Sequence, residues 1–275
     1  MNVRITGFVF AMLAALLCTA VAAEQPAAKA EPFTFVQLCD PQIGFKDYAV
    51  ELKRLQQAVA RINQERPDFV VICGDLVNTA DEKSFADFNE AMNRLAVPVH
   101  CAPGNHDVGN KPTEVTLARY RKAIGKDYYS FEHKGRLFVV ANSQLWKSPL
   151  PGESEKHNAW FKEELERAAK KQQPVFVICH YLPFEKTHDE PEAYFNLPLD
   201  KRQELLGLFH RYGVVAVLAG HTHKTLLLDH AGIQFVSSET TSVNFDQRPY
   251  GFRCWHVGTQ RPFQHEFVPL VDAPK

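Results

Sequence analysis

The chain has 275 residues, of which 45% are hydrophobic and 23% are charged, and its formal net charge is −1. This length and composition allow a large buried core and favour one sizeable domain. Because the near-neutral charge gives no basic surface that would attract a phosphate backbone, no nucleic acid is expected as the main partner.

The N-terminus has the pattern of a secretory signal peptide. Arg4 supplies positive charge, residues 5–17 are almost wholly apolar, and small residues up to Ala23 offer a cleavage site. A membrane anchor is the alternative, but this apolar run is shorter than the roughly 20 residues that a spanning helix needs. Lipidation of Cys18 ranks lower because the residue before it is the bulky Leu17. Cleavage is therefore the favoured interpretation.

Three segments follow from this interpretation. Residues 1–23 are the signal peptide, residues 24–31, rich in Ala, Pro, Lys and Glu, are a flexible leader, and residues 32–271 form the domain. We expect the mature chain to be periplasmic or secreted, without a stable membrane span.

Strand and helix signals alternate through most of the domain. Short apolar runs predict strands, and apolar residues at helical spacing predict the helices between them. The expected strands cover residues 33–39, 69–73, 97–101, 128–133, 136–141, 175–179 and 214–219. The expected helices cover residues 48–65, 82–95, 113–124, 153–171 and 201–212.

The last part of the chain contains strand signals alone, at residues 225–229, 234–237, 252–257 and 263–268. Alternating strands and helices followed by antiparallel hairpins indicate a sheet-rich α/β sandwich.

Polar side chains able to bind metals follow five of the predicted strands. Such groups are costly beside apolar runs unless something satisfies them, so their recurrence at five strand ends indicates one shared site. Within the turn that follows the third strand, Gly104 is expected to let the backbone bend sharply. The candidate ligands are Asp40, Asp75, Asn105, His180, His221 and His223.

This donor set favours a dinuclear metal site. Oxygen and nitrogen ligands without thiolate suit Mn, Fe or Zn better than Ca or Mg. Six ligands exceed what one tetrahedral ion needs, so two ions bridged by a carboxylate fit better. Two ions roughly 3.5–4 Å apart generate a hydroxide and clamp the attacking and leaving oxygens at phosphorus. Phosphoester hydrolysis by in-line attack is therefore the leading reaction class.

Five cysteines remain after the signal peptide, and four of them lie in apolar runs beside the candidate ligands. We favour small buried hydrophobic residues over disulfides or thiolate ligands, because the chain has no CxxC pair. A bridge between neighbouring strand ends stays open. The five are Cys39, Cys73, Cys101, Cys179 and Cys254.

The order of these motifs resembles the calcineurin-like metallophosphoesterase superfamily. The resemblance rests on Asp40, Gly74-Asp75, Gly104-Asn105-His106-Asp107, His180 and Gly220-His221-Thr222-His223. A closer resemblance, to a subgroup of serine/threonine phosphatases with an Asp-Pro-Gln first motif, rests on residues 40–44, 73–76, 104–109, 142–144, 194–197, 236–238 and 251–253.

The resemblance implies an α/β fold of two packed mixed β-sheets flanked by helices, with the ligands on loops at one edge. It implies a first metal held by Asp40, Asp75 and His223. It implies a second metal held by the bridging Asp75 with Asn105, His180 and His221. His106 would protonate the leaving oxygen, and Asp107 would orient its ring.

Two positions depart from related patterns. Most superfamily members have His two residues after the first Asp, whereas this chain has Gln42, a weaker neutral donor that can still bind a metal. The first metal is therefore expected to be loosely held, although the closer subgroup shares this Gln. Purple acid phosphatases have Tyr where this chain has Asn78, which counts against that branch.

The segment 181–199 lies between two ligand-bearing strands and is expected to overhang the site. Trp146 and Phe195 are further candidates for its wall, and Arg248 is expected to contact the phosphate oxygens. The residues expected to bind substrate are Asn105, His106, Tyr194, Asn196 and Arg248.

Three functions remain open. The first is a phosphomonoesterase acting on a phosphorylated small molecule or a phosphoprotein, including phosphoserine and phosphothreonine. The second is a phosphodiesterase or nucleotide hydrolase on the same site. The third is a non-catalytic exported protein that binds metal or phosphate, against which the intact His106-Asp107 pair argues, since binding needs no proton donor.

Overall fold

The computed structural model describes residues 31–270. The expected signal peptide at residues 1–23 and nearly all of the leader at residues 24–31 lie outside the described residues.

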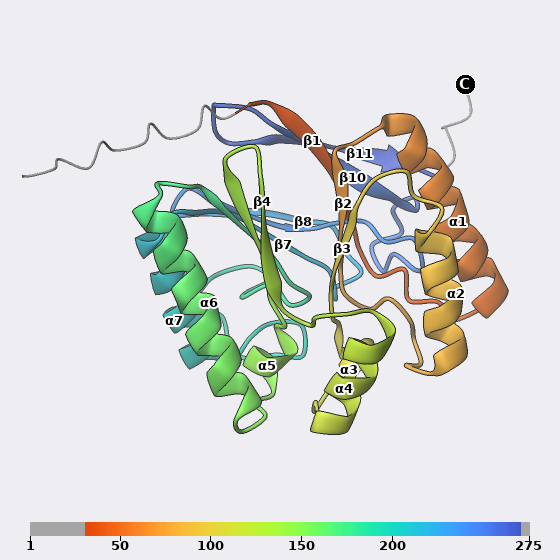
Figure 1. The fold of residues 1–275 in the computed structure, drawn as a ribbon, viewed down its shortest axis with the longest axis horizontal. Coiled ribbons are helices and arrows are strands. Elements are labelled where there is room, and N and C mark those ends of the chain that lie inside the picture. The colour runs from red at the N-terminus through yellow and green to blue at the C-terminus, as the bar shows by residue number, and fades with distance from the viewer. Residues whose placement is uncertain (1–30, 271–275) are drawn as a thin grey trace, which may run out of the picture.

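Eleven strands form two mixed sheets in the part of the chain that the structure describes (Figure 1). The first sheet has the order β11-β10-β1-β2-β3, and the second has the order β4-β5-β6-β7-β9-β8. The strands are β1 (Phe33–Leu38), β2 (Phe69–Cys73), β3 (Val99–Ala102), β4 (Tyr129–His133), β5 (Arg136–Val140), β6 (Val175–Ile178), β7 (Val214–Ala219), β8 (Leu226–His230), β9 (Ile233–Ser237), β10 (Gly251–Val257) and β11 (Gln264–Pro269).

Helices cover the outer face of each sheet. Figure 1 shows α1 and α2 beside the first sheet and α6 and α7 beside the second. The helices are α1 (Tyr48–Glu65), α2 (Glu82–Met92), α3 (Asn105–Val108), α4 (Glu114–Ala123), α5 (Gln144–Lys147), α6 (Glu153–Lys170) and α7 (Leu199–Arg211). The expected α/β fold of two packed mixed sheets flanked by helices is confirmed.

The core has three layers, because successive side chains on a strand face opposite sides. Phe35 of β1 packs between the sheets against Phe138 and Phe176, whereas Val36 and Leu38 face α1 and α2. A third cluster joins the second sheet to α6 and α7. The five cysteines are free and buried, as expected of small hydrophobic side chains.

Most predicted element bounds agree with the structure to within two residues. Helix α1 has the predicted bounds, since the Asp47 side chain caps its first turn by accepting from the Val50 amide and Arg66 ends it in a left-handed conformation. Helix α7 begins two residues early because Pro198 occupies its N-cap position. The short helices α3 and α5 were not predicted, since a single turn carries no hydrophobic period.

The parallel strands bring the candidate ligands to one edge of the sandwich. Strands β1, β2 and β3 run parallel in one sheet, and β5, β6, β7 and β9 run parallel in the other. The loops at their carboxyl ends therefore meet at the same edge.

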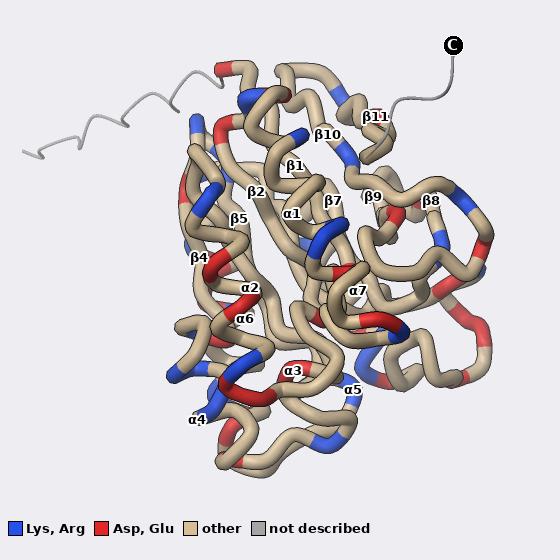
Figure 2. Tube along the Cα trace, turned by 90° about the vertical axis from the view of Figure 1, so that its right-hand side faces the viewer, with Lys and Arg blue, Asp and Glu red and all other residues tan. Residues whose placement is uncertain are grey.

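Lys and Arg are interspersed with Asp and Glu along the visible elements (Figure 2), which agrees with the near-neutral net charge. Among residues 31–270, no helix combines the length and the hydropathy that crossing a membrane requires.

Candidate metal centre

Two groups of buried side chains at this edge could each hold a metal ion. Asp75, His180 and His221 form one group, and Asp40, Asp75 and His223 form the other. Within each group the potential ligand atoms lie within 4.8 Å of one another. Asp75 belongs to both groups, which is the arrangement that a bridging carboxylate requires.

The first of these groups is tightly packed around His180. Its Nε2 atom lies 3.3 Å from Oδ2 of Asp75, 3.0 Å from Oδ1 of Asn105 and 3.1 Å from Nδ1 of His221. Asn105 therefore adds a fourth potential ligand atom. The second group is more open, with Nε2 of His223 3.6 Å from Oδ1 of Asp40.

Backbone carbonyls fix the orientation of all three imidazoles. Nδ1 of His180 lies 2.8 Å from the Cys73 oxygen, and Nδ1 of His223 lies 2.6 Å from the Val243 oxygen. Nε2 of His221 lies 3.3 Å from the Tyr194 oxygen. A carbonyl only accepts, so these nitrogens carry the protons, and the opposite nitrogens remain free to bind a metal.

The ligand-bearing backbone is held in the sparsely populated left-handed region. The φ angles are 44° at Asp40, 49° at Asp75, 68° at His221 and 51° at His223. Asp and His adopt this region more readily than most residues other than Gly and Asn, and residues in it are frequent at functional sites. Four of the six candidate ligands share this conformation, so the chain turns sharply at the ligand positions.

Gly104 acts through its size rather than through backbone freedom. Its φ of −105° is one that any residue adopts, so the expected requirement for a sharp glycine bend is wrong. A Cβ atom there would overlap the Asp75 carboxylate, and one on Gly220 would overlap the Asp40 carboxylate. Both glycines are needed because the chain passes directly over a ligand.

The buried carboxylates require positive charge between them. Burial raises the pKa of Asp40, and nearby His223 and His180 oppose this only in part. Burial also acts to raise the pKa of Asp75, but His180, His106 and His221 together outweigh it and the net pKa is lowered. Burial acts to lower the pKa of His180, yet Asp75 and Asp40 raise it to about 9. The cluster thus binds either a proton or metal cations.

Gln42 has the properties of an additional oxygen ligand. Its side chain is 1% exposed, and its Oε1 atom is buried without a hydrogen-bond partner among the described residues. Its Nε2 atom donates to Oδ1 of Asn78 at 3.4 Å, so the amide is held through its nitrogen alone. An unpaired buried carbonyl oxygen costs free energy unless something binds it. The residues present therefore fit two metal ions.

His106 lies beside this cluster, but Asp107 does not orient its ring. The His106 amide donates to Oδ1 of Asp75 at 2.9 Å, and ring atom Nδ1 donates to the Asn78 oxygen at 3.0 Å. The buried Asp107 carboxylate instead accepts from the amides of Gly104, Leu76 and Val77 at 2.8–3.2 Å. The predicted catalytic part for Asp107 is therefore wrong, because its oxygens already hold two loops together.

Tyr194, Asn196 and Arg248 were expected to bind substrate from loops that carry no metal ligand. Of these three, Tyr194 packs against a potential metal ligand, His221. It is 53% exposed, and its ring centroid lies 4.9 Å from that of His221. Asn196 is buried, and its amide is used within its own loop, by Ala193, Glu190 and Pro191. The prediction that Asn196 contacts substrate is therefore wrong.

Arg248 and Trp146 both interact with residues outside the metal-binding groups. Arg248 is paired with Glu239, at 3.3 Å, and with Asp246, at 3.6 Å, and Glu239 also binds Arg253 at 2.8 Å. The expected contact of Arg248 with phosphate stays a prediction. The Trp146 ring is buried in the core against Phe161, which excludes it from the wall of the site. Phe195 lies near the site, 5.2 Å from His221 between ring centroids.

Three residues near the site had no sequence signal that singled them out. Phe45 and Phe245 pack against His223, with ring centroids at 5.4 Å and 4.7 Å. Buried Glu51 accepts from the amides of Gly44 and Lys46, each at 2.8 Å, and so fixes the loop that follows Asp40. In the sequence, Glu51 looks like an ordinary acidic residue in the first turn of α1. Its bonds to the preceding loop are seen only in the structure.

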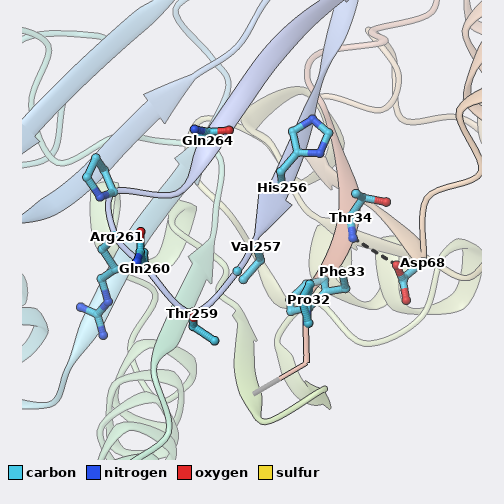
Figure 3. A pocket seen from close by; sticks show the side chains of 12 residues that line it. Pro32, Phe33, Thr34, Asp68, His256, Val257, Thr259, Gln260, Arg261 and Gln264 are labelled. Carbon is cyan, nitrogen blue, oxygen red and sulfur yellow. Dashed lines mark hydrogen bonds between the residues drawn. The ribbon is translucent and has the colours of Figure 1, made fainter. Parts of the chain in front are cut away.

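The sandwich has a hollow of about 670 Å³ at the opposite end of β1 (Figure 3). Asp68 lines it, but its carboxylate already binds the Thr34 amide, His133 and Lys134. None of the residues in the two metal-binding groups lines this hollow. The potential metal ligands therefore lie at the strand ends and not around this hollow.

Comparison with known proteins agrees with this site. The sequence profile of the calcineurin-like phosphoesterase family matches residues 33–225. The serine/threonine-protein phosphatase CPPED1 of Danio rerio is 32% identical over 264 residues, which cover 87% of this chain and 85% of that protein.

Two solved structures share the fold at lower identity. A dimetal phosphatase from Danio rerio has a TM-score of 0.67 at 18% identity and covers 88% of this chain and 98% of its own. GAP50, described as the anchor in the inner membrane complex of Plasmodium, has a TM-score of 0.63 at 15% identity, over 87% of this chain and 85% of its own. The profile match and the CPPED1 relative go beyond fold, and together with the two metal-binding groups they show that this chain belongs to the calcineurin-like phosphoesterase family and is a metal-dependent phosphoric ester hydrolase.

Proposed function

We propose that the protein is a phosphomonoesterase whose two metal ions share Asp75 and whose general acid is His106. The observation that carries the proposal is the pair of ligand groups meeting at one buried carboxylate, with the His106 amide donating to the same carboxylate. Asp40, Asp75 and His223, with Gln42, would hold one ion. Asp75, Asn105, His180 and His221 would hold the other.

The bound ions would supply a nucleophile from water at neutral pH and neutralise charge on the phosphoryl oxygens. Mn, Fe and Zn fit this set of nitrogen and oxygen donors. The Nδ1 proton of His106 is engaged by the Asn78 oxygen, so Nε2 is the nitrogen available to the substrate. In this proposal His106 donates a proton from Nε2 to the leaving oxygen.

The CPPED1 relative supports a phosphorylated protein side chain or a phosphorylated small molecule as substrate, because that relative is named a serine/threonine-protein phosphatase. The sequence of residues 1–23 supports export of this chain to the periplasm or the medium, where ordinary intracellular phosphoproteins are scarce. Intact mass of the protein recovered from each cellular fraction tests export. A chain that keeps its N-terminal 23 residues in the cytoplasm would contradict it.

The test of the reaction uses the chain from Glu24, with metal content measured alongside hydrolysis of aryl phosphate monoesters and diesters, with and without Mn²⁺. We expect metal-dependent monoester hydrolysis that is lost in His106→Ala. His256→Ala is the matched control, since His256 is exposed and paired with Glu266. Preferred diester turnover would instead support a phosphodiesterase. Bound metal without turnover of either ester would support a binding protein.

A further inference from the structure

Aromatic rings flank the metal-binding cluster on the side of His223. The Phe245 ring stacks on the His223 ring, with centroids 4.7 Å apart and an interplanar angle of 18°. The Phe45 ring lies 5.4 Å from His223 and 6.2 Å from Phe245. Phe245 is nevertheless 44% exposed, so a large part of its surface meets solvent.

A second group of rings lies on the side of His221. The Tyr194 ring lies 4.9 Å from the His221 ring, and the Phe195 ring lies 5.2 Å from it. Tyr194 and Phe195 also pack edge to face at 5.0 Å. Tyr194 therefore lies directly against His221, a residue that could bind the second ion.

The ligands themselves fix both groups of rings. The Phe245 amide donates to the His223 oxygen at 2.7 Å, and Nε2 of His221 donates to the Tyr194 oxygen at 3.3 Å. The nearby loop at residues 193–196 is held by Lys147, whose Nζ atom donates to the Ala193 and Asn196 oxygens at 2.7 Å and 2.8 Å. The exposed rings are thus positioned before any substrate arrives, which lowers the cost of binding.

Exposure of a single apolar side chain is common on protein surfaces and does not by itself indicate a function. Phe245 and Tyr194 differ from other exposed apolar residues because each ring lies against an imidazole that could bind a metal ion. Both rings leave apolar surface uncovered beside the metal-binding cluster. Their faces are uncharged, and the two arginines on this side, Arg248 and Arg253, are balanced by Glu239 and Asp246. This surface therefore fits a neutral flat group better than a second anion.

We propose that Phe245 and Tyr194 form an aromatic rim that binds a flat, uncharged ring in the leaving group of the substrate. The inference rests on the proposed function and narrows its substrate class to phosphate esters of aryl or arylmethyl alcohols. The phosphoryl group would be held at the metal-binding cluster, and the ring of the leaving group would pack against the rim. Phe245 and Tyr194 set specificity and take no part in the proton transfer.

Binding of two phosphonates to the Mn²⁺-loaded chain tests the rim without turnover. Benzylphosphonate carries the ring and methylphosphonate does not, and calorimetry gives the ratio of their Kd values. We expect benzylphosphonate to bind more tightly. The ratio should fall roughly two- to tenfold in Phe245→Leu and in Tyr194→Leu, as expected for the loss of one ring contact. Tyr194→Phe should keep the ratio because it keeps the ring.

Leu227→Ala is the control, because Leu227 is also an exposed hydrophobic residue, 52% exposed, but lies on β8. Equal affinity for the two phosphonates, or a ratio unchanged in both Leu variants, would overturn the rim. Turnover of benzyl phosphate and ethyl phosphate separates the two proposals. If both esters are hydrolysed at equal rates, the rim proposal is wrong and the proposed reaction stands. If neither ester is hydrolysed but benzylphosphonate binds tightly, the proposed reaction is wrong and the rim proposal stands.

Discussion

The ring of His106 is held by a backbone carbonyl, with Nδ1 3.0 Å from the oxygen of Asn78. Asn78 follows β2 within the same loop as Asp75, so the loop that carries the shared carboxylate also orients the proposed acid. No carboxylate is needed for this orientation. The position of His106 therefore depends on the fold of the loop after β2.

His106→Ala is expected to lower kcat for a monoester by about 10²–10⁴-fold, since a positioned general acid contributes that much. Metal content should stay at the native value, because the ring is not a member of either metal-binding group. Steady-state kinetics and elemental analysis on the same sample measure both quantities. A variant that loses its metal together with its activity would place His106 among the ligands instead.

Asp107→Asn is expected to destabilise the fold more than it changes the chemistry. An amide side chain has one acceptor oxygen, so it leaves part of the three backbone amides unpaired at a cost of about 1–3 kcal/mol. For a chain of this size, each kcal/mol lowers Tm by about 2–4 °C. Thermal unfolding measures the loss, with exposed Asp189→Asn as the matched control. An unchanged Tm with kcat as low as in His106→Ala would restore the catalytic interpretation.

The ligand set was predictable from sequence because each ligand directly follows an apolar strand, and parallel strands align their carboxyl ends. The hydrogen-bond partners of Asp107 were not predictable from sequence, since they depend on how the loops after β2 and β3 approach each other. Asn196 was misassigned for a similar reason: its loop closes on itself, and residues three to six positions away use its amide. Phe245 reaches His223 through contacts between loops, which a linear pattern does not show.

Asp75→Asn is expected to remove both metal ions, whereas His223→Ala should remove one. Asp75 belongs to both ligand groups, and His223 belongs to one. Equilibrium dialysis against Mn²⁺ followed by elemental analysis gives the number of ions bound per chain. Two ions retained in Asp75→Asn would show that this carboxylate does not bridge.

The variant Gln42→Leu tests whether the Gln42 side chain binds a metal ion or is only a buried amide. If Oε1 binds the ion held by Asp40 and His223, its loss should lower the affinity for that ion by at least roughly tenfold. Even residues that only support a metal ligand contribute about 10–100-fold to affinity. Competition with a chelator measures the affinity. A higher Tm of the metal-free variant with unchanged affinity would show that Oε1 was only an unsatisfied acceptor. Gln42→His should raise the affinity for the same ion, because imidazole is a better ligand for these metals than an amide oxygen.

Acid is expected to destabilise the fold through His157. Burial, reinforced by the charge of Lys201, lowers its pKa from 6.5 to about 3, and its Nε2 atom accepts from the Asn142 amide. The unfolded chain therefore binds a proton below pH 6.5 that the folded chain refuses, so stability is lost as the pH falls from 6.5 towards 3. At pH 5 this amounts to about 2 kcal/mol.

His157→Gln keeps an acceptor and removes the titration. Urea unfolding of the chelator-treated protein at pH 7 and pH 5 measures the effect without interference from metal release. The native chain should lose about 2 kcal/mol more between the two pH values than the variant does. Equal losses in both proteins would show that His157 is protonated within the fold and that the acid sensitivity arises elsewhere.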